Sequence, residues 1–253
     1  QRPHARDYIE SIVEDFHELY GDRKFANDPA IMAGMGFIEE NPVCVISTQK
    51  GRKTKEKVHH NFGMSRPEGY RKALRLMQLA SKFSIPIITL IDTPGAYPGL
   101  GAEERGQAQA IAENLREMFD IEAPILSVVI GEGGSGGALG IGIADCVLML
   151  EYSTYSVISP ESCASILWAD PLRAEQAANS LQLGPAKAKE LNVIDEIVSE
   201  PSGGAHRNPE EACELLKKAL IREIKMLKKK NVKSLLDRRY EKFRHMGNQT
   251  LSY

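Results

Sequence analysis

The segment of this 253-residue chain with the strongest chemical signal is the glycine-rich stretch 131–137, Gly-Glu-Gly-Gly-Ser-Gly-Gly. It follows an apolar run, 125–130, that predicts a buried strand, and it precedes a helix predicted over 138–144. Glycine lets the main chain turn with positive φ and lets a ligand approach it closely. The N–H groups at the start of a helix are free donors at the positive end of its dipole. The turn therefore suits an anion, namely a phosphate, a carboxylate or a developing oxyanion.

One interpretation of this turn is a dinucleotide site, because Gly131, Gly133 and Gly136 satisfy G-x-G-x-x-G. That fingerprint needs a long helix after the turn and an acid at the end of the next strand. Glu151 could be the acid, but the predicted helix is short and contains glycine. The sequence supports this interpretation only weakly.

A second interpretation is a nucleophile elbow, because residues 133–137 also satisfy G-x-S-x-G around Ser135. His206 and His245 are the only histidines after Ser135, so a triad of Ser135, an acid and His206 is compatible with the chain order. We favour Ser135 as a small polar residue that the turn tolerates. The third interpretation is an oxyanion site made of backbone N–H groups, without a protein nucleophile.

The loop 92–101 is the second candidate segment, since it follows a buried strand predicted over 85–91. Its start, Asp-Thr-Pro-Gly, imitates a GTPase D-x-x-G, but the sequence has no phosphate-cradling G-x-x-x-x-G-K-[ST], so that interpretation is rejected. Open α/β sheets bind ligands at the carboxyl ends of their strands. We therefore expect loop 92–101 and the glycine turn to face one pocket, joined by a helix predicted over 103–119.

The order of the predicted elements indicates an α/β domain with much parallel pairing. Apolar spacing predicts further helices over 10–20, 68–83, 161–168, 171–181 and 208–230, and further strands over 43–46, 147–150 and 193–198. The chain has no internal repeat and no long linker. We expect a single domain, 1–253, with a core about 25–200 and C-terminal helices about 208–245.

Composition narrows the function classes. The formal charge is −2 and no apolar run approaches the ~20 residues of a membrane-spanning helix, so neither nucleic acid nor a membrane is expected. The polar start does not resemble a signal peptide, and a first residue other than Met predicts that something upstream was trimmed or not included. Four scattered cysteines without a Cys-x-x-Cys pair predict no zinc site and a reducing compartment. The basic stretch 221–245 is expected to be a solvated helix face, with a docking surface for an acidic partner or ligand as the alternative. A second basic stretch, 50–57, is expected to be a loop that contacts a partner or an anionic substrate.

Long motifs spread over the chain resemble one family, the carboxyltransferase alpha subunits of bacterial and plastid acetyl-coenzyme A carboxylase. The matching segments are 7–9, 21–23, 61–64, 66–77, 91–99, 102–107, 131–139, 153–161 and 203–207. The resemblance implies a ClpP/crotonase-type fold, a spiral of β-β-α units, rather than a Rossmann sheet. It also implies transfer of carboxyl from carboxybiotin on a carrier protein to acetyl-coenzyme A, giving malonyl-coenzyme A for fatty-acid synthesis.

The resemblance also implies roles for the glycines. Gly136 and Gly137 match the family's pair of backbone donors for the ureido oxygen of biotin, and the freed biotin nitrogen is the expected base, which leaves Ser135 without a chemical role. We expect valine at either glycine to abolish transfer while the protein still folds. The expected lining of the carboxybiotin pocket is Gly133, Gly134, Gly95, Ala96 and Tyr97.

The same resemblance implies the partners. A beta subunit is expected to hold acetyl-coenzyme A and the zinc, in an α2β2 assembly with the biotin carboxyl carrier protein and, in the wider complex, biotin carboxylase. This chain is expected to bind no cofactor or metal of its own and to reside in the cytoplasm or the plastid stroma. Ser162 and His60 depart from the family pattern, where glycine and arginine are expected, and a leading helical segment that would support an assembly contact is absent from the sequence.

Overall fold

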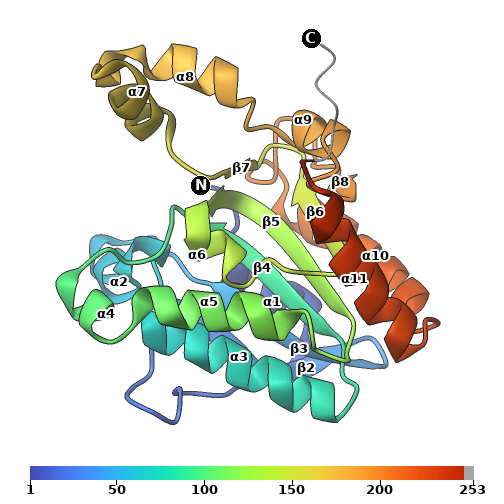
Figure 1. Cartoon of the computed structure of the whole chain (residues 1–253). Helices are drawn as coiled ribbons and strands as arrows, with labels where there is room; N and C mark the ends of the chain where they lie inside the picture. Colours follow the sequence, from blue (N-terminus) through green and yellow to red (C-terminus); the bar gives the residue numbers. More distant parts are fainter. Residues whose placement is uncertain (248–253) are drawn as a thin grey trace.

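The computed structural model describes residues 1–247, and these form an α/β architecture around one mixed sheet of eight strands (Figure 1). The strands are β1 (Glu14–Glu18), β2 (Ile31–Ile38), β3 (Asn41–Thr48), β4 (Ile87–Thr93), β5 (Ile125–Gly134), β6 (Cys146–Leu150), β7 (Thr154–Ser156) and β8 (Glu196–Val198). Their order is β1-β2-β3-β4-β5-β6-β8, with β7 paired to the end of β5. The first three strands pair antiparallel and the others parallel. The end of the predicted domain, 248–253, lies outside the described residues.

Helices cover both faces of the sheet, which explains why the central parallel strands β4, β5 and β6 are largely apolar and buried. Helices α3 (Pro67–Lys82) and α5 (Gln107–Met118) pack on one face, against side chains such as Ile87 and Ile91. Helices α1 (Ala5–Ile12) and α10 (Pro209–Leu227) pack on the other face, against Ile88 and Leu90. Among the described residues, no helix is long and apolar enough to cross a membrane.

The helix predicted over 10–20 is wrong beyond Ile12, where α1 ends and β1 follows as an edge strand of the sheet. The same apolar spacing fits both states over so short a run. Pairing with β2 decides the outcome, since a Cβ on Gly34 would lie 2.3 Å from the carbonyl oxygen of His17. Two glycines of β2, Gly34 and Gly36, thus leave the room that β1 occupies.

Two helices near the glycine turn differ from the prediction. The helix predicted over 103–119 is divided into α4 (Leu100–Glu104) and α5, because Gly106 between them has φ +82°. The helix predicted over 138–144 is instead α6 (Ser135–Leu139), which begins inside the glycine turn. The basic stretch 50–57 was predicted as a loop, but it contains the start of α2 (Thr54–His59). The strands predicted at 43–46, 85–91, 125–130 and 147–150 are confirmed with small changes of boundary.

The C-terminal helices predicted about 208–245 are α10 and α11 (Val232–His245), and both pack on the body. Arg239 of α11 is fully buried and forms a bidentate ion pair with Asp145, with nitrogen–oxygen distances of 3.0 and 2.7 Å. Its guanidinium also donates to the carbonyl oxygens of Met118, Ile121 and Ala123. A buried charge with every donor satisfied is a specific anchor. It fixes α11 to the loop between α5 and β5.

A small helical lobe stands apart from this body, at the upper left of Figure 1. It comprises α7 (Pro160–Trp168), the 3-10 turn η2 (Pro171–Arg173) and α8 (Ala174–Leu181). We call residues 157–182 the α7–α8 lobe. Its own core is small, consisting of Cys163, Ala164 and Ala177. The short helix α9 (Pro185–Glu190) leads from the lobe back to β8.

Candidate active site

The glycine turn is formed at the end of β5, where the strand pairs with β4 on one side and β7 on the other. Beyond Ile130 the strand extends to Gly134 and pairs with β7, with Gly133 opposite Tyr155. Helix α6 starts immediately afterwards at Ser135, whose φ of +53° places it in the left-handed region. Non-glycine residues seldom adopt that conformation, and a sharp strand-to-helix turn requires it. The turn therefore presents the first residues of α6 at the carboxyl end of the sheet.

The turn packs directly on loop 92–101, which follows β4; the two segments were expected to face one pocket, but no residue of the loop lines the groove at Gly136. A Cβ built on Gly137 would lie 2.3 Å from the carbonyl carbon of Gly95 and 2.5 Å from the nitrogen of Ala96. A Cβ on Gly134 would lie 2.2 Å from the carbonyl oxygen of Pro94. These are contacts between main chains, so nothing larger than glycine fits. The expectation that valine at position 137 leaves the fold intact is contradicted by this geometry.

Gly136 differs from its neighbour, because a side chain there would meet no main-chain atom. The nearest atom to a Cβ at this position is Cδ1 of Ile111, at 4.0 Å. The residue lies on a groove with a volume of about 280 Å³. The groove is lined by Ser135, Gly136, Leu139, Tyr155, Ser156, Val157 and Val193. Glycine is therefore not needed here to avoid a clash. Its lack of a side chain instead leaves the main chain accessible from the groove.

The N–H groups of Gly136 and Gly137 have no hydrogen-bond acceptor in the described part of the chain. This follows from their position, because the first N–H groups of a helix have no partner within it. They lie at the end of α6 where the helix dipole favours negative charge. Gly136 borders the groove, whereas Gly137 is buried one residue further along the helix. The arrangement can stabilise an anion that enters from the groove.

Hydrogen bonds on the body side hold the turn in place. Thr93 Oγ1 accepts from the N–H of Gly95 at 3.1 Å and donates to the carbonyl oxygen of the same residue at 2.8 Å. The buried Asn114 donates to the carbonyl oxygens of Tyr70 and Gly140, at 3.1 and 2.9 Å. The hydroxyl of Tyr70 in turn donates to the carbonyl oxygen of Gly137 at 3.4 Å. The donor site thus rests on side chains from β4, α3 and α5.

A charged cluster connects β4 and β5 just before the turn. Asp92 Oδ1 accepts from Lys50 Nζ at 2.9 Å and from the N–H of Glu132 at 3.0 Å. Lys50 also donates to Glu132 Oε2 at 2.9 Å. Burial lowers the pKa of Lys50, but the two carboxylates outweigh it and hold that pKa above its usual value. Gly131 permits this cluster, since a Cβ there would lie 2.6 Å from Asp92 Oδ1.

The residues expected to line the carboxybiotin pocket occupy two different places. Gly133 is buried against the ring of Tyr155, 2.7 Å from the position of a Cβ, and Gly134 is held against Pro94. Gly95 and Ala96 support Gly137 from behind, and Tyr97 packs under the guanidinium of Arg66, 5.0 Å from the ring centre. None of these five borders the groove at Gly136.

The groove walls that sequence reasoning missed come from β7 and the residue after it. Tyr155, Ser156 and Val157 belong to the family-like motif 153–161, to which the sequence assigned no role. Burial raises the pKa of Tyr155, so its hydroxyl stays protonated at neutral pH. The motif was a usable signal, but only the pairing of β7 with the end of β5 brings it beside Gly136.

The other chemical interpretations lack their partners in this structure. Ser135 is exposed, and its hydroxyl makes no hydrogen bond to any group in residues 1–247. His206 lies instead in the loop after β8, its ring beside Gly204. Glu151, the candidate ribose acid, accepts from the N–H of Glu200 at 3.0 Å. Across residues 1–247, no three His, Cys, Asp or Glu side chains gather closely enough to hold a metal ion.

Comparison with solved structures defines the class of fold. Transcarboxylase 12S, with methylmalonyl-coenzyme A and methylmalonic acid bound, is similar with a TM-score of 0.74 at 19% identity, over 91% of this chain and 43% of the other. The beta subunit of P. aeruginosa geranyl-CoA carboxylase gives a TM-score of 0.66 at 16% identity, over 87% of this chain and 41% of the other. The chain therefore has the crotonase-type fold of carboxyltransferases, as the resemblance predicted.

Sequence comparison defines the family. The family described as acetyl co-enzyme A carboxylase carboxyltransferase-like matches residues 1–247. The acetyl-coenzyme A carboxylase carboxyl transferase subunit alpha of Xanthomonas axonopodis pv. citri is 58% identical, over 98% of this chain and 77% of the relative. The protein of the same name from Geobacter metallireducens is 60% identical, over 97% of this chain and 77% of the relative. This chain belongs to that family of carboxyltransferase alpha subunits, so it is a transferase component, not a hydrolase or an oxidoreductase.

Proposed function

We propose that this chain binds carboxybiotin in the groove at Gly136, and that the N–H groups of Gly136 and Gly137 stabilise the oxyanion formed in carboxyl transfer. The observation that carries the proposal is the difference between the two glycines. Gly137 is closed off by the main chain of loop 92–101, whereas Gly136 opens on the groove. We propose that the Gly136 N–H meets the oxyanion from the groove and that the neighbouring Gly137 N–H, which has no acceptor among the described residues, supports it from the buried side.

The chain's residues would act by positioning and charge stabilisation. Carboxybiotin supplies the carboxyl group, and negative charge develops on its ureido oxygen as that group leaves. A backbone donor aimed at such an oxygen is worth roughly 3–4 kcal/mol. Leu139, Tyr155 and Val157 would flank the bicyclic ring and exclude water, which strengthens the donors. No residue of this chain is assigned as nucleophile or base, because the freed nitrogen of biotin can take the proton of the acyl substrate.

The acyl substrate, acetyl-coenzyme A, is proposed to be held by a second subunit. The relatives are named subunit alpha, and the chain matches only 40–43% of the transcarboxylase 12S chain, whose remainder leaves room for a further unit. We propose the α2β2 assembly with a zinc-bearing beta subunit, served by the biotin carboxyl carrier protein and biotin carboxylase, in fatty-acid biosynthesis in the cytoplasm or plastid stroma. The α7–α8 lobe supports this, because its Val157, Ile166 and Leu172 are 74, 74 and 91% exposed.

An assay of carboxyl transfer from carboxybiotin to acetyl-coenzyme A, with and without a candidate beta subunit, tests the proposal. We expect no malonyl-coenzyme A from the chain alone and turnover once the partner is added. Metal analysis of the chain alone should find no zinc, because its thiols are scattered and all four are buried. Stoichiometric zinc in the chain alone, or carboxylation of acetyl-coenzyme A without a partner, would overturn the assignment of the zinc and of acetyl-coenzyme A to a beta subunit.

A further inference from the structure

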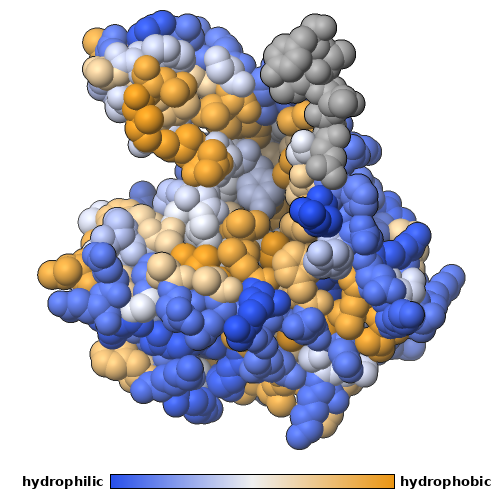
Figure 2. All heavy atoms as spheres, viewed as in Figure 1, coloured by the Kyte–Doolittle hydropathy of each residue, from blue (hydrophilic) through white to orange (hydrophobic). Residues whose placement is uncertain are grey.

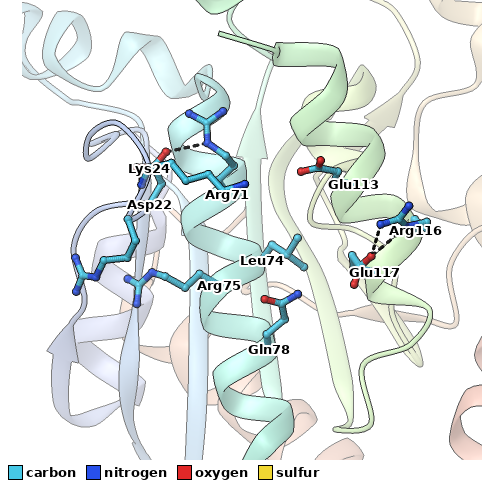
Figure 3. Close-up of a pocket in the computed structure, with 10 residues that line it drawn as sticks. Asp22, Lys24, Arg71, Leu74, Arg75, Gln78, Glu113, Arg116 and Glu117 are labelled. Carbon is cyan, nitrogen blue, oxygen red and sulfur yellow. Dashed lines mark hydrogen bonds and ion pairs between the residues drawn. The ribbon is translucent and has the colours of Figure 1, made fainter.

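A second groove lies on the outer side of the helical layer, between α3, α5 and the loop 20–26 (Figure 3). We call it the arginine groove, and its volume is about 460 Å³. It shares no lining residue with the groove at Gly136. It is lined by Asp22, Arg23, Lys24, Arg71, Leu74, Arg75, Gln78, Glu113, Arg116 and Glu117.

Two guanidinium groups meet on one carbonyl oxygen at one end of this groove. Arg23 Nη1 donates to the carbonyl oxygen of Tyr20 at 3.1 Å, and Arg75 Nη2 donates to the same oxygen at 3.3 Å. Arg75 Nε donates to the carbonyl oxygen of Gly21 at 3.2 Å. Within residues 1–247, neither arginine forms an ion pair with a carboxylate. Two adjacent positive charges thus remain without a neutralising partner.

Three carboxylates line the groove; Asp22 and Glu117 are held by other charged groups, and Glu113 accepts from Gln109 Nε2 at 2.9 Å. Asp22 Oδ1 accepts from the N–H groups of Lys24, Phe25 and Ala26, and its Oδ2 accepts from Arg71 Nε at 2.8 Å. These donors outweigh burial and hold the pKa of Asp22 below its usual value. On the facing helix Glu117 pairs with Arg116 at 2.6 Å, as Figure 3 shows. Neither acid is available to the pair formed by Arg23 and Arg75.

The loop that carries Arg23 is held in one conformation. Gly21 and Arg23 both have positive φ, +75° and +62°, and the second is unusual for a residue with a side chain. Asn27 Oδ1 accepts from the N–H of Gly21 at 3.0 Å, in addition to the three bonds that Asp22 accepts. Strain of this kind persists only where the surroundings enforce it. The conformation of the loop, fixed by these hydrogen bonds, therefore places the guanidinium group of Arg23 beside that of Arg75.

We propose that the arginine groove binds a polyanion of the phosphate class, with the diphosphate group on Arg23 and Arg75. Guanidinium groups bind phosphate oxygens through two parallel hydrogen bonds, and a second negative charge suits the second arginine. Leu74 and Gln78 lie beside Arg75 on α3, where they would contact an uncharged body attached to the diphosphate. A free phosphorylated metabolite and the diphosphate of coenzyme A share this chemistry.

Calorimetric titration of the protein with inorganic pyrophosphate, at low and at physiological salt, tests this site. Arg23→Gln removes an exposed side chain and should fold normally. Arg75→Lys keeps a charge while it removes the paired nitrogens. We expect each variant to weaken pyrophosphate binding at least about tenfold, the loss of one charge-assisted hydrogen bond. The matched control is Lys218→Gln, which removes one charge from a remote side chain that is 75% exposed.

Equal pyrophosphate binding by wild type, both groove variants and the control would overturn the proposal, as would no binding by the wild type. A second arm titrates coenzyme A in the presence of pyrophosphate. If coenzyme A competes with pyrophosphate in the wild type and this competition is lost in Arg23→Gln, the site binds coenzyme A. If coenzyme A does not compete in the wild type, the site binds a free phosphorylated metabolite. These outcomes do not depend on Gly136, so the proposed carboxyl-transfer site can fail while this one stands.

Discussion

The glycine turn and the α7–α8 lobe lie at the same end of the sheet, but they are packed in opposite ways (Figure 1). The turn is enclosed by its own chain, with main-chain contacts at Gly134 and Gly137 and hydrogen bonds from three elements. The lobe has a core of only three buried residues, while Ile166, Leu167 and Leu172 are 74, 63 and 91% exposed. Space-filling representation shows apolar surface on the side of the lobe that faces the body (Figure 2).

This difference in packing matches two requirements of the proposed site: rigid donors and a surface that a second protein covers. A donor pair must be held rigidly before the reaction, and a chain can achieve that alone by dense packing. Exposed apolar side chains at this density are usual where a second protein is bound. We infer that the chemistry of the site is built within this chain, whereas its closure requires another.

The largest effect is expected from Gly137→Ala. A Cβ there would lie 2.3 Å from main-chain carbon, so either the turn or loop 92–101 must move. We expect the free energy of unfolding to fall by about 3 kcal/mol or more, at the upper end of overpacking. Denaturant unfolding measures this directly. A variant as stable as the wild type would mean that the two loops are not packed as described.

The matched variant is Gly136→Ala, one residue earlier in the same helix. Its Cβ meets nothing closer than 4.0 Å, and alanine is favoured over glycine in helices by up to about 1 kcal/mol. Stability should be kept or increased, whereas carboxyl transfer should fall at least about tenfold because the methyl group covers the donor site. Unchanged transfer would exclude Gly136 as the exposed donor.

An intermediate effect is expected from Leu172→Asp on the lobe. The side chain is 91% exposed, so the stability of the isolated chain should change by less than about 0.5 kcal/mol. If the partner covers this leucine, losing its burial should weaken assembly about tenfold or more. Assembly is measured by sedimentation against the beta subunit, with Asn179→Asp as the control at an exposed polar position of the lobe. Equal assembly of both variants would place the interface elsewhere.

Local patterns in the sequence predicted most of the body but not the division between the two glycines. Long apolar runs determine β4 and β5 because both faces of the sheet are covered. Edge strand β1 was mistaken for helix, since only pairing with β2 distinguishes the two. Gly136 and Gly137 are chemically identical in the sequence, and their roles differ only through loop 92–101, which contacts one of them. The groove wall at Tyr155 likewise depends on the pairing of β7 with β5, a contact between distant elements.

The smallest effect is expected from Ser135→Ala, although this serine occupies the centre of a nucleophile-elbow motif. Its left-handed conformation at a strand-to-helix turn is the one that a nucleophilic serine would adopt. However, its hydroxyl has no hydrogen-bonding histidine or acid in the described residues, so nothing would remove its proton. Alanine keeps a Cβ at the same φ, so the donor N–H groups should stay in place and transfer should fall by less than about threefold. A loss near a thousandfold at unchanged stability, as deletion of a nucleophile produces, would show that the turn supplies chemistry beyond its two donors.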